Sequence, residues 1–247
     1  TRRVGVGARR WTTAELLGTE ARMLDVAEAG QGCGVEVIHE ELVDATLRSR
    51  PELGGDQSAM VRHLARSGDT VGVVVGRAGS GKTYALATAV ELWRTAGYEP
   101  VGVALAARAA AELHAGAGLR ASTIAQMLVD AGRCDAPVLN EWSILVVDEA
   151  GMVDTRRLAT LIDMADEAGA KVVLVGDHHQ LPAVETGGSF AALVGRLDPV
   201  ELVTNRRQVE AWEADALARL RTGAGGRSGI EDVVDDYDAR GRVQVGE

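Results

Sequence analysis

The chain has 247 residues, of which 46% are hydrophobic and 25% charged, with a formal net charge of −10. This length suits one large α/β domain with a small appendage, and the net acidity weighs against a freestanding nucleic-acid binder, although one local groove could still bind DNA. No apolar run reaches the roughly 18 residues of a membrane span and no signal peptide opens the chain, so we expect a cytoplasmic protein without a membrane partner.

The first 55 residues are predicted to form a helical N-terminal subdomain or linker. The first helix begins at Thr12-Thr13-Ala14-Glu15, which offers a threonine cap and an acid in the first turn, and continues to about residue 29. Further helices are expected at 39–48 and 56–67. Since Thr1 is not a methionine, we expect a piece of a longer protein. Cys33 and Cys134 are far apart and lie outside C-x-x-C spacing, so we expect buried or free thiols in a reducing cytoplasm.

Strand and helix patterns alternate from residue 71 onward, which predicts a mostly parallel sheet covered by helices on both faces. The strands are continuous Val, Ile and Leu runs, as expected when both faces are buried. They are predicted at 71–75, 101–105, 144–147, 172–175 and 200–203, and the helices at 83–95, 106–116, 122–131, 155–168 and 189–194. Residues 56–208 would form this ATPase-like domain. Residues 209–247 would begin an inserted or following subdomain, with a helix at 210–221 and a strand at 241–245.

A glycine-rich loop follows the first strand and fits G-x-x-x-x-G-K-[ST] at every fixed position. Its glycines let backbone N–H groups converge on phosphate oxygens, and the helix beginning near Thr83 turns its positive end toward them. Lys82 is expected to reach the β- and γ-phosphates, and the Thr83 hydroxyl to bind Mg²⁺. The alternative is a chance glycine-rich turn. The predicted nucleotide-binding residues are Gly76, Arg77, Ala78, Gly79, Ser80, Gly81, Lys82 and Thr83.

Two adjacent carboxylates end the strand predicted at 144–147. Asp148 at the strand tip would hold Mg²⁺ opposite Thr83, directly or through water. Glu149 is placed to orient and deprotonate the attacking water. The alternative is an acidic helix start after a buried strand, which the upstream phosphate loop makes the weaker interpretation.

The next strand ends in Gly176-Asp177-His178-His179-Gln180-Leu-Pro. The amide of Gln180 can bond both water and a γ-phosphate oxygen, and so can sense the third phosphate. The histidine pair suggests a metal site, but no companion ligands stand at zinc spacing, and we interpret it as part of a polar loop.

Two further polar segments complete the set. Asn205-Arg206-Arg207-Gln208 could supply an arginine finger that stabilises transition-state charge, or simply two solvated arginines at a helix start. Gln57 stands at a predicted helix N-terminus, and its amide offers a donor and an acceptor to adenine.

In their order along the chain, Gln57, the phosphate loop and the three later segments resemble the first motor domain of a superfamily 1 helicase of the RecD-like branch. They are most similar to the helicase portion of conjugative relaxases of the TraA, TrwC and TraI type, the MobF family. The segments Trp11-Thr-Thr-Ala-Glu-Leu-Leu and Glu20-Ala-Arg-Met-Leu also resemble the joint between relaxase and helicase in actinobacterial versions. The resemblance covers nearly the whole chain from residue 11, and Gly-Asp-x-x-Gln-Leu-Pro is its specific part.

This resemblance implies a RecA-like P-loop ATPase that uses ATP and Mg²⁺, with single-stranded DNA and a second RecA-like motor domain as partners. It implies that Gln57 reads adenine, that Gln180 couples the γ-phosphate to DNA, and that Arg207 contacts the γ-phosphate. The segment 102–110 corresponds to a DNA-contacting motif, A-P-T-x-[KR]-A-A, in which Leu105 and Ala106 replace Pro and Thr. DNA binding here is therefore expected to be weak or incomplete.

Three other interpretations stay open. The chain could be a piece of a RecD-like repair helicase, or a nucleotide-binding module without significant turnover. An AAA+-type ATPase would place a lone polar sensor after Asp-Glu, and the Gln-Leu-Pro loop argues against it. Glu149 and Arg207 favour turnover, whereas the missing second motor domain favours inertness.

Overall fold

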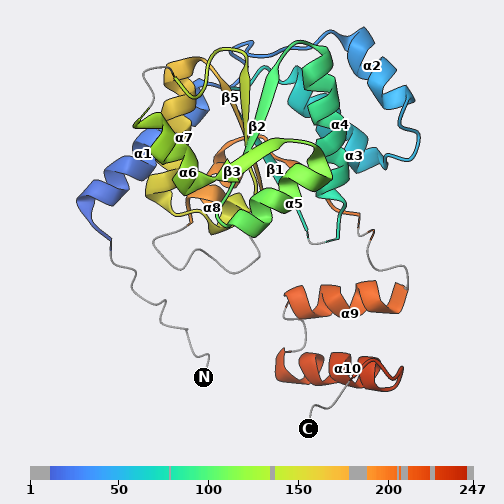
Figure 1. Cartoon of the computed structure of the whole chain (residues 1–247). Helices are drawn as coiled ribbons and strands as arrows, with labels where there is room; N and C mark the ends of the chain where they lie inside the picture. The colour runs from blue at the N-terminus through green and yellow to red at the C-terminus, as the bar shows by residue number, and fades with distance from the viewer. Residues whose placement is uncertain are drawn as a thin grey trace.

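A computed structural model of the chain describes residues 12–77, 79–133, 137–177, 188–204, 206, 211–222 and 226–243. Its strands form one sheet between two layers of helices (Figure 1). Across the described residues, no helix combines the length and the apolar character that crossing a membrane requires. The strands are β1 (Val71–Gly76), β2 (Glu99–Ala104), β3 (Arg120–Thr123), β4 (Ser143–Val147), β5 (Lys171–Gly176) and β6 (Val200–Leu202). The helices are α1 (Ala14–Ala29), α2 (Glu40–Arg48), α3 (Gly55–Arg66), α4 (Lys82–Thr95), α5 (Ala107–Ala117), α6 (Ile124–Ala131), the 3₁₀ turn η1 (Ala150–Met152), α7 (Thr155–Ala168), α8 (Ser189–Arg196), α9 (Ala211–Thr222) and α10 (Gly226–Asp238).

The sheet has the order β3-β2-β4-β5-β1-β6, and every neighbouring pair is parallel. Val71 of β1 pairs with Val172 of β5, and Val74 pairs with Val200 of β6. Because all strands point the same way, their carboxyl ends share one edge of the sheet, where α/β proteins usually bind ligands. The residues that directly follow β1, β4 and β5, namely Arg77, Asp148 and Asp177, therefore lie at that edge.

Successive residues of the central strands face two separate hydrophobic cores. In β1, Val71, Val73 and Val75 face a cluster that contains side chains of α1, α7 and α8. Val74 faces a second cluster, built with α3, α4 and α5. Every residue of β1, β4 and β5 is buried, as parallel strands covered on both faces require. The predicted α/β fold is confirmed.

Helix ends follow local sequence signals. The Thr13 side chain accepts a hydrogen bond from Leu16 N at 3.2 Å, which confirms the predicted cap of α1. Asp154 caps α7 in the same way, through Arg157 N at 3.0 Å. That helix ends at Gly169, whose left-handed conformation (φ 66°) favours glycine.

The first two helices pack on the same cores as the sheet. Met23, Leu24 and Ala27 of α1 lie in the first cluster, and Val43 of α2 lies in the second. The boundary placed at residue 55 between a helical subdomain and the ATPase-like domain stays a prediction.

Three elements differ from the sequence expectations. β3 was not predicted, and its last two residues stand where the helix at 122–131 was expected to begin; its four residues, Arg120 to Thr123, are half-exposed or exposed. The acidic segment near residue 235, which had no predicted structure, forms α10. The strand predicted at 241–245 is not found in its described part, residues 241–243, which form a turn and irregular backbone.

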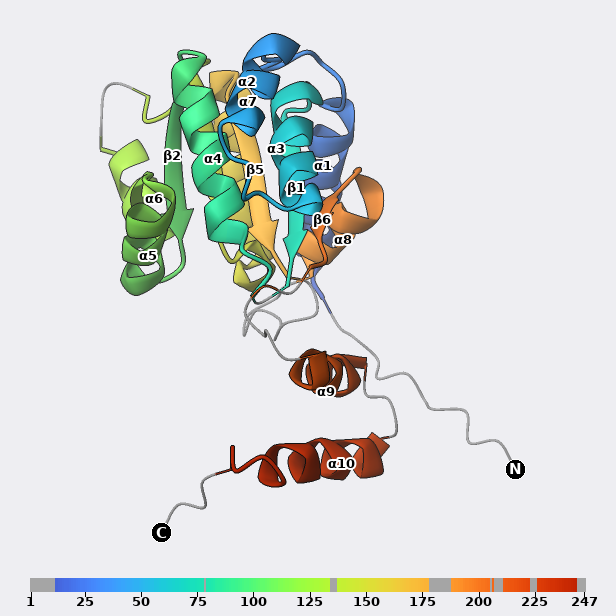
Figure 2. The ribbon, with the colours of Figure 1, turned by 90° about the vertical axis from the view of Figure 1, so that its right-hand side faces the viewer.

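Helices α9 and α10 lie side by side beyond the carboxyl edge of the sheet (Figure 2). The rings of Trp212 and Tyr237 meet edge to face with centroids 5.0 Å apart, and the Arg240 guanidinium lies 4.2 Å from the Trp212 ring centroid. Ala216 and Val233 are buried between the two helices. The last described segment is thus a helical hairpin held by aromatic, cation–π and apolar contacts.

Candidate functional site

The predicted phosphate loop joins β1 to α4 at the carboxyl edge of the sheet. All its residues except Ala78 are described. Gly79 and Gly81 have φ angles of 83° and 76°, in the left-handed region that favours glycine. Gly81 is also the residue that precedes α4, so the N-terminus of this helix opens directly at the loop. Such an end carries unpaired N–H groups and positive potential, and it binds anions.

Lys82 folds over the beginning of the loop. Its Nζ donates to Gly76 O at 2.6 Å and to Arg77 O at 3.3 Å. A Cβ at Gly76 would lie 2.5 Å from Lys82 Cγ and Cδ, so only glycine leaves room for this side chain. The ammonium group therefore lies inside the loop, where phosphate oxygens are predicted to bind.

Thr83 is exposed beside Lys82, in the first turn of α4. Its methyl group points at α5, because a Cβ at Gly116 would lie 2.4 Å from Thr83 Cγ2. Gly116 thus permits the close approach of α5 to the beginning of α4.

The two predicted carboxylates follow β4. Asp148 N donates to Val103 O at 3.0 Å, which extends the pairing of β4 with β2 to the strand tip. The Asp148 carboxylate accepts a hydrogen bond from Glu149 N at 2.9 Å. Burial raises the pKa of Asp148, and the Lys82 ammonium acts in the opposite direction through its positive charge. Asp148 and Lys82 thus both lie at the carboxyl ends of the parallel strands.

Glu149 is exposed and has a left-handed backbone, with φ 53° and ψ 35°. Among the described residues other than glycine, only Glu36 shares a positive φ. Such backbone strain is concentrated at functional sites, where the surrounding structure maintains it. Here the 3₁₀ turn η1 follows at once, and Met152 N donates to Glu149 O at 2.8 Å.

The neighbouring strand β5 ends close by in Gly176 and the buried Asp177. A Cβ at Gly176 would lie 2.9 Å from Gly151 N and 3.0 Å from the Phe190 ring. The glycine of the predicted Gly-Asp element therefore serves the close packing of β5 against η1 and α8.

Gln57 lies next to the phosphate loop and is 1% exposed. Its Oε1 accepts a hydrogen bond from Gly54 N at 3.0 Å, and its Nε2 donates to Gly81 O at 3.0 Å. Both ends of the amide are thus engaged by backbone groups. Reading adenine, the predicted role of Gln57, would use the second lone pair or the second N–H of this amide.

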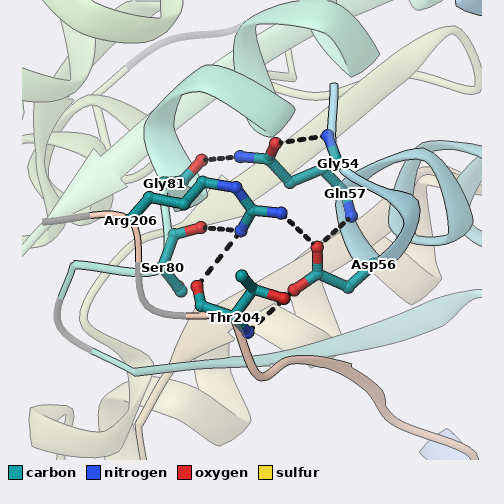
Figure 3. A network of polar contacts seen from close by, with 7 residues as sticks. All are labelled: Gly54, Asp56, Gln57, Ser80, Gly81, Thr204 and Arg206. Atoms are coloured by element: carbon teal, nitrogen blue, oxygen red, sulfur yellow. Dashed lines mark hydrogen bonds and ion pairs between the residues drawn. The ribbon is translucent and has the colours of Figure 1, made fainter. Parts of the chain in front are cut away.

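Sequence reasoning missed a second set of polar residues on the same loop. Asp56 and Arg206 form an ion pair, and Arg206 Nη1 donates to Ser80 O at 2.8 Å (Figure 3). Thr204 N donates to Asp56 at 3.0 Å. The signals available in the sequence were the acid that directly precedes Gln57 and the arginine that directly precedes Arg207.

Several predicted residues lie outside the described part of the chain. These are Ala78, His178, His179, Gln180 and Arg207. Their predicted roles stay predictions.

The segment aligned with the DNA-contacting motif, 102–110, runs from the end of β2 into the first turn of α5. Ala106 precedes α5 and offers no side-chain cap. Arg108 is exposed and pairs with Glu112 at 2.9 Å, one helical turn away. This segment therefore presents one arginine side chain to solvent and has no side-chain hydroxyl group.

The predicted Mg²⁺ ligands suit that ion chemically. Mg²⁺ prefers oxygen ligands and usually takes one or two carboxylates together with substrate phosphates. Thr83 and Asp148 supply a hydroxyl and a carboxylate at the same edge of the sheet. Among the described residues, no group of three or more His, Cys, Asp or Glu side chains could hold a metal ion by itself.

Comparisons with known proteins agree with the geometry. The protein family described as AAA domain matches residues 52–247. The chain is 37% identical over 240 residues to the probable conjugal transfer protein TraA of Sinorhizobium fredii, covering 96% of this chain and 21% of the relative. It is 37% identical over 239 residues to the conjugal transfer protein TraA of Rhizobium radiobacter, covering 95% and 21%.

A third relative is the ATP-dependent RecD2 DNA helicase of Deinococcus radiodurans, 29% identical over 164 residues, which cover 65% of this chain and 22% of the relative. The chain spans about a fifth of the length of these relatives. The name of the matched family, AAA domain, resembles that of the AAA+-type ATPases considered above. The loop at 180–182, which argued against that interpretation, lies outside the described residues.

The resemblance inferred from the sequence motifs is confirmed by these relatives, and the family match extends over most of the chain, including the phosphate loop and the Asp148-Glu149 pair. The chain belongs to the AAA domain family and is similar in sequence to the TraA conjugal transfer proteins.

Proposed function

We propose that this chain is the first motor domain of a superfamily 1 DNA helicase, which binds and hydrolyses ATP in the cytoplasm during conjugal DNA transfer. One observation carries the proposal. The Lys82 side chain folds back over a loop with two left-handed glycines, where its Nζ donates to Gly76 O and Arg77 O, and Asp148 stands at the tip of β4 at the same carboxyl end of the parallel strands. The TraA relatives, matched over nearly the whole chain, support the conjugal setting.

In this proposal Lys82 exchanges its carbonyl partners, Gly76 and Arg77, for the β- and γ-phosphates of ATP. A phosphate oxygen is the stronger partner because it carries charge. Thr83 and Asp148 would hold Mg²⁺, which neutralises charge on the phosphates when bound.

Glu149 would take a proton from the attacking water. It is suited to this role because its side chain is exposed and its strained backbone is fixed between β4 and η1. Gln180 would orient the water and sense the γ-phosphate, and Arg207 would stabilise charge on the γ-phosphate in the transition state.

Single-stranded DNA and a second motor domain are the proposed partners. Translocation requires two motor domains that close on ATP and grip the strand in turn, and this chain supplies one. Since it spans about a fifth of its relatives, the remainder of such a protein would carry the second. With Ala106 in place of the motif's threonine, backbone N–H groups would make the phosphate contact on this side.

The decisive experiment measures ATP hydrolysis with and without single-stranded DNA, on this chain and on a version extended through a second motor domain. We expect slow turnover by this chain, and DNA stimulation in the extended protein. Glu149→Gln should retain ATP and lower turnover by about 100-fold or more, the usual contribution of a general base. Normal phosphate release by this variant would remove Glu149 from the role of base.

Two alternatives give different results. A nucleotide-binding module would bind ATP without DNA-stimulated turnover even in the extended protein. A RecD-like repair helicase, which the RecD2 relative supports, would hydrolyse ATP with DNA but lack a relaxase domain upstream in its gene.

A further inference from the structure

Three consecutive carbonyl groups of the phosphate loop are held by residues from outside it. Arg206 N donates to Gly79 O at 2.8 Å, and Arg206 Nη1 donates to Ser80 O at 2.8 Å. Gln57 Nε2 donates to Gly81 O at 3.0 Å. Figure 3 shows the two side-chain donors, Gln57 from the beginning of α3 and Arg206 from the segment after β6.

The direction of these bonds matters because a peptide unit is planar and trans. In such a unit the carbonyl of one residue and the N–H of the next point in opposite directions. Anchoring Ser80 O therefore turns the N–H group of Gly81 away from Arg206. Gly81 O also accepts Tyr84 N and Ala85 N at 3.2 Å, so α4 and Gln57 together turn the N–H group of Lys82 away from Gln57. These are N–H groups that a phosphate-binding loop presents to its ligand.

Asp56 fixes the position of the arginine. Its carboxylate pairs with Arg206 Nη2 and also accepts Thr204 N at 3.0 Å, so it holds the side chain and the backbone of the same segment. The Asp56 and Arg206 side chains are only 10% and 27% exposed. Burial opposes ionisation of Asp56, but hydrogen bonds from Arg206 and Thr204 prevail and lower its pKa to about 2.

Two glycines provide the space for this arrangement. A Cβ at Gly54 would lie 1.9 Å from Arg206 Nη2, and a Cβ at Gly81 would lie 2.6 Å from Gln57 Nε2. Gly54 has an ordinary extended backbone, with φ −68°, so space alone restricts that position. A Cβ at the next residue, Gly55, would meet nothing within 4 Å among the described residues.

We propose that Asp56 and Arg206 are positioning residues, which tie the segment after β6 to the phosphate loop and hold its carbonyl groups so that its N–H groups face the nucleotide. This inference rests on the proposed function, since it concerns the same loop. This link between Asp56, Arg206 and the loop, called the tether below, contacts the part of the loop that precedes Lys82. It should therefore serve ADP and ATP alike, which separates it from a group that contacts the γ-phosphate.

The experiment titrates fluorescent ADP and ATP into the wild-type chain and into the Asp56→Ala and Arg206→Ala variants. We expect the Kd for both nucleotides to rise together by about tenfold, a typical effect of losing hydrogen bonds to a charged group. Arg207→Ala is the comparison variant. It carries the same change one residue later, and should weaken ATP binding while sparing ADP.

Gly54→Ala and Gly55→Ala form a matched pair. The first methyl would displace the Arg206 guanidinium and should raise the Kd for both nucleotides about tenfold, whereas the second has free space and should leave both unchanged. When Arg206→Ala is already present, Gly54→Ala should have no further effect, because no guanidinium remains to be displaced. This dependence on Arg206 distinguishes the tether from a loss of stability at the beginning of α3.

The outcomes separate the two proposals. A wild-type chain that binds neither nucleotide would overturn the proposed function. If it binds both, unchanged Kd values in folded Asp56→Ala, Arg206→Ala and Gly54→Ala would overturn the tether alone. Equal effects of Gly54→Ala with and without Arg206 would do the same. Thermal denaturation without nucleotide shows that each variant is folded at the titration temperature.

Discussion

Lys82 and Lys171 lie at opposite ends of the strands of one parallel sheet, Lys82 at the carboxyl edge and Lys171 at the amino edge. Each donates a hydrogen bond to a backbone carbonyl oxygen. Lys82 follows the end of β1 and reaches Gly76 O at 2.6 Å, whereas Lys171 begins β5 and reaches Leu64 O at 2.8 Å. The Lys171 side chain is 1% exposed, with the carboxylate of Glu36 3.9 Å away. Lys82 is half-buried in a loop that opens to solvent. The two lysines share a type of contact and differ in access.

The two edges also differ in the pKa values of their buried ionisable groups. At the amino edge, burial raises the pKa of Glu36 to about 8, although the Lys171 charge opposes this, and burial lowers the pKa of Lys171. At the carboxyl edge, Asp56 stays ionised because Arg206 and Thr204 hold it. We infer that the polar groups at the amino edge, called the sealed edge below because Lys171 and Glu36 are fully buried there, serve packing. Charged groups stay available at the carboxyl edge, where a triphosphate is proposed to bind.

Lys82→Ala tests this contrast with the largest expected effect. The loop would lose the charge that reaches the phosphates, and we expect the Kd for ATP to rise by at least about 1,000-fold, or ~4 kcal/mol. The free energy of unfolding should change little, because the side chain is only half-buried. A fluorescent-nucleotide titration checks the first statement and urea unfolding the second. ATP affinity within a few-fold of the wild type would remove Lys82 from the site.

The central strands could be predicted from sequence because their burial on both faces leaves continuous apolar runs. All five predicted strands are present, with ends that shift by one or two residues. β3 could not be predicted, because a four-residue edge strand with the sequence Arg-Ala-Ser-Thr has neither such a run nor a buried face. α10 was missed because acidic residues concealed the apolar positions, such as Val233, that pack on α9.

The phosphate loop and the carboxylate pair could be predicted because each is contiguous in sequence. The tether could not, because Asp56 and Arg206 are brought together only by the fold. The requirement for glycine at position 54 likewise depends on a guanidinium from the far end of the domain. Local patterns predict segments, whereas contacts between distant segments depend on the order of strands β1 and β6 in the sheet.

Lys171→Met tests the sealed edge. Removing the ammonium group leaves the buried carboxyl group of Glu36 without its neighbour, and we expect the free energy of unfolding to fall by about 2 kcal/mol, the usual cost of a buried polar group that has lost its partner. The hydrogen bond to Leu64 O at the end of α3 is lost as well. Nucleotide affinity of the folded variant should stay that of the wild type, since the substitution lies at the amino edge of the sheet. The measurements are urea unfolding and nucleotide titration.

Lys82→Met is the matched control for that variant, because it makes the same substitution at the other edge. The two variants should give opposite results, with stability lost in one and affinity lost in the other. A loss of both properties in Lys171→Met would mean that the two edges are coupled.

Glu36→Gln should change the pH dependence of stability. The pKa of Glu36 rises from 4.5 to about 8 on folding, because burial disfavours the carboxylate more than Lys171 favours it. Between these two pH values the folded chain retains a proton that the unfolded chain has released, so this residue makes stability fall as the pH rises. The glutamine side chain cannot titrate, so the variant should lose the contribution of residue 36 to the fall in stability with rising pH. Urea unfolding of both proteins from pH 5 to pH 8 measures this change. Asp69, whose charge acts on Lys171, and Tyr98, on which the Glu36 charge acts, are present in both proteins. Equal slopes in the two proteins would mean that Glu36 keeps its charge inside the fold, and that the sealed edge holds an ion pair.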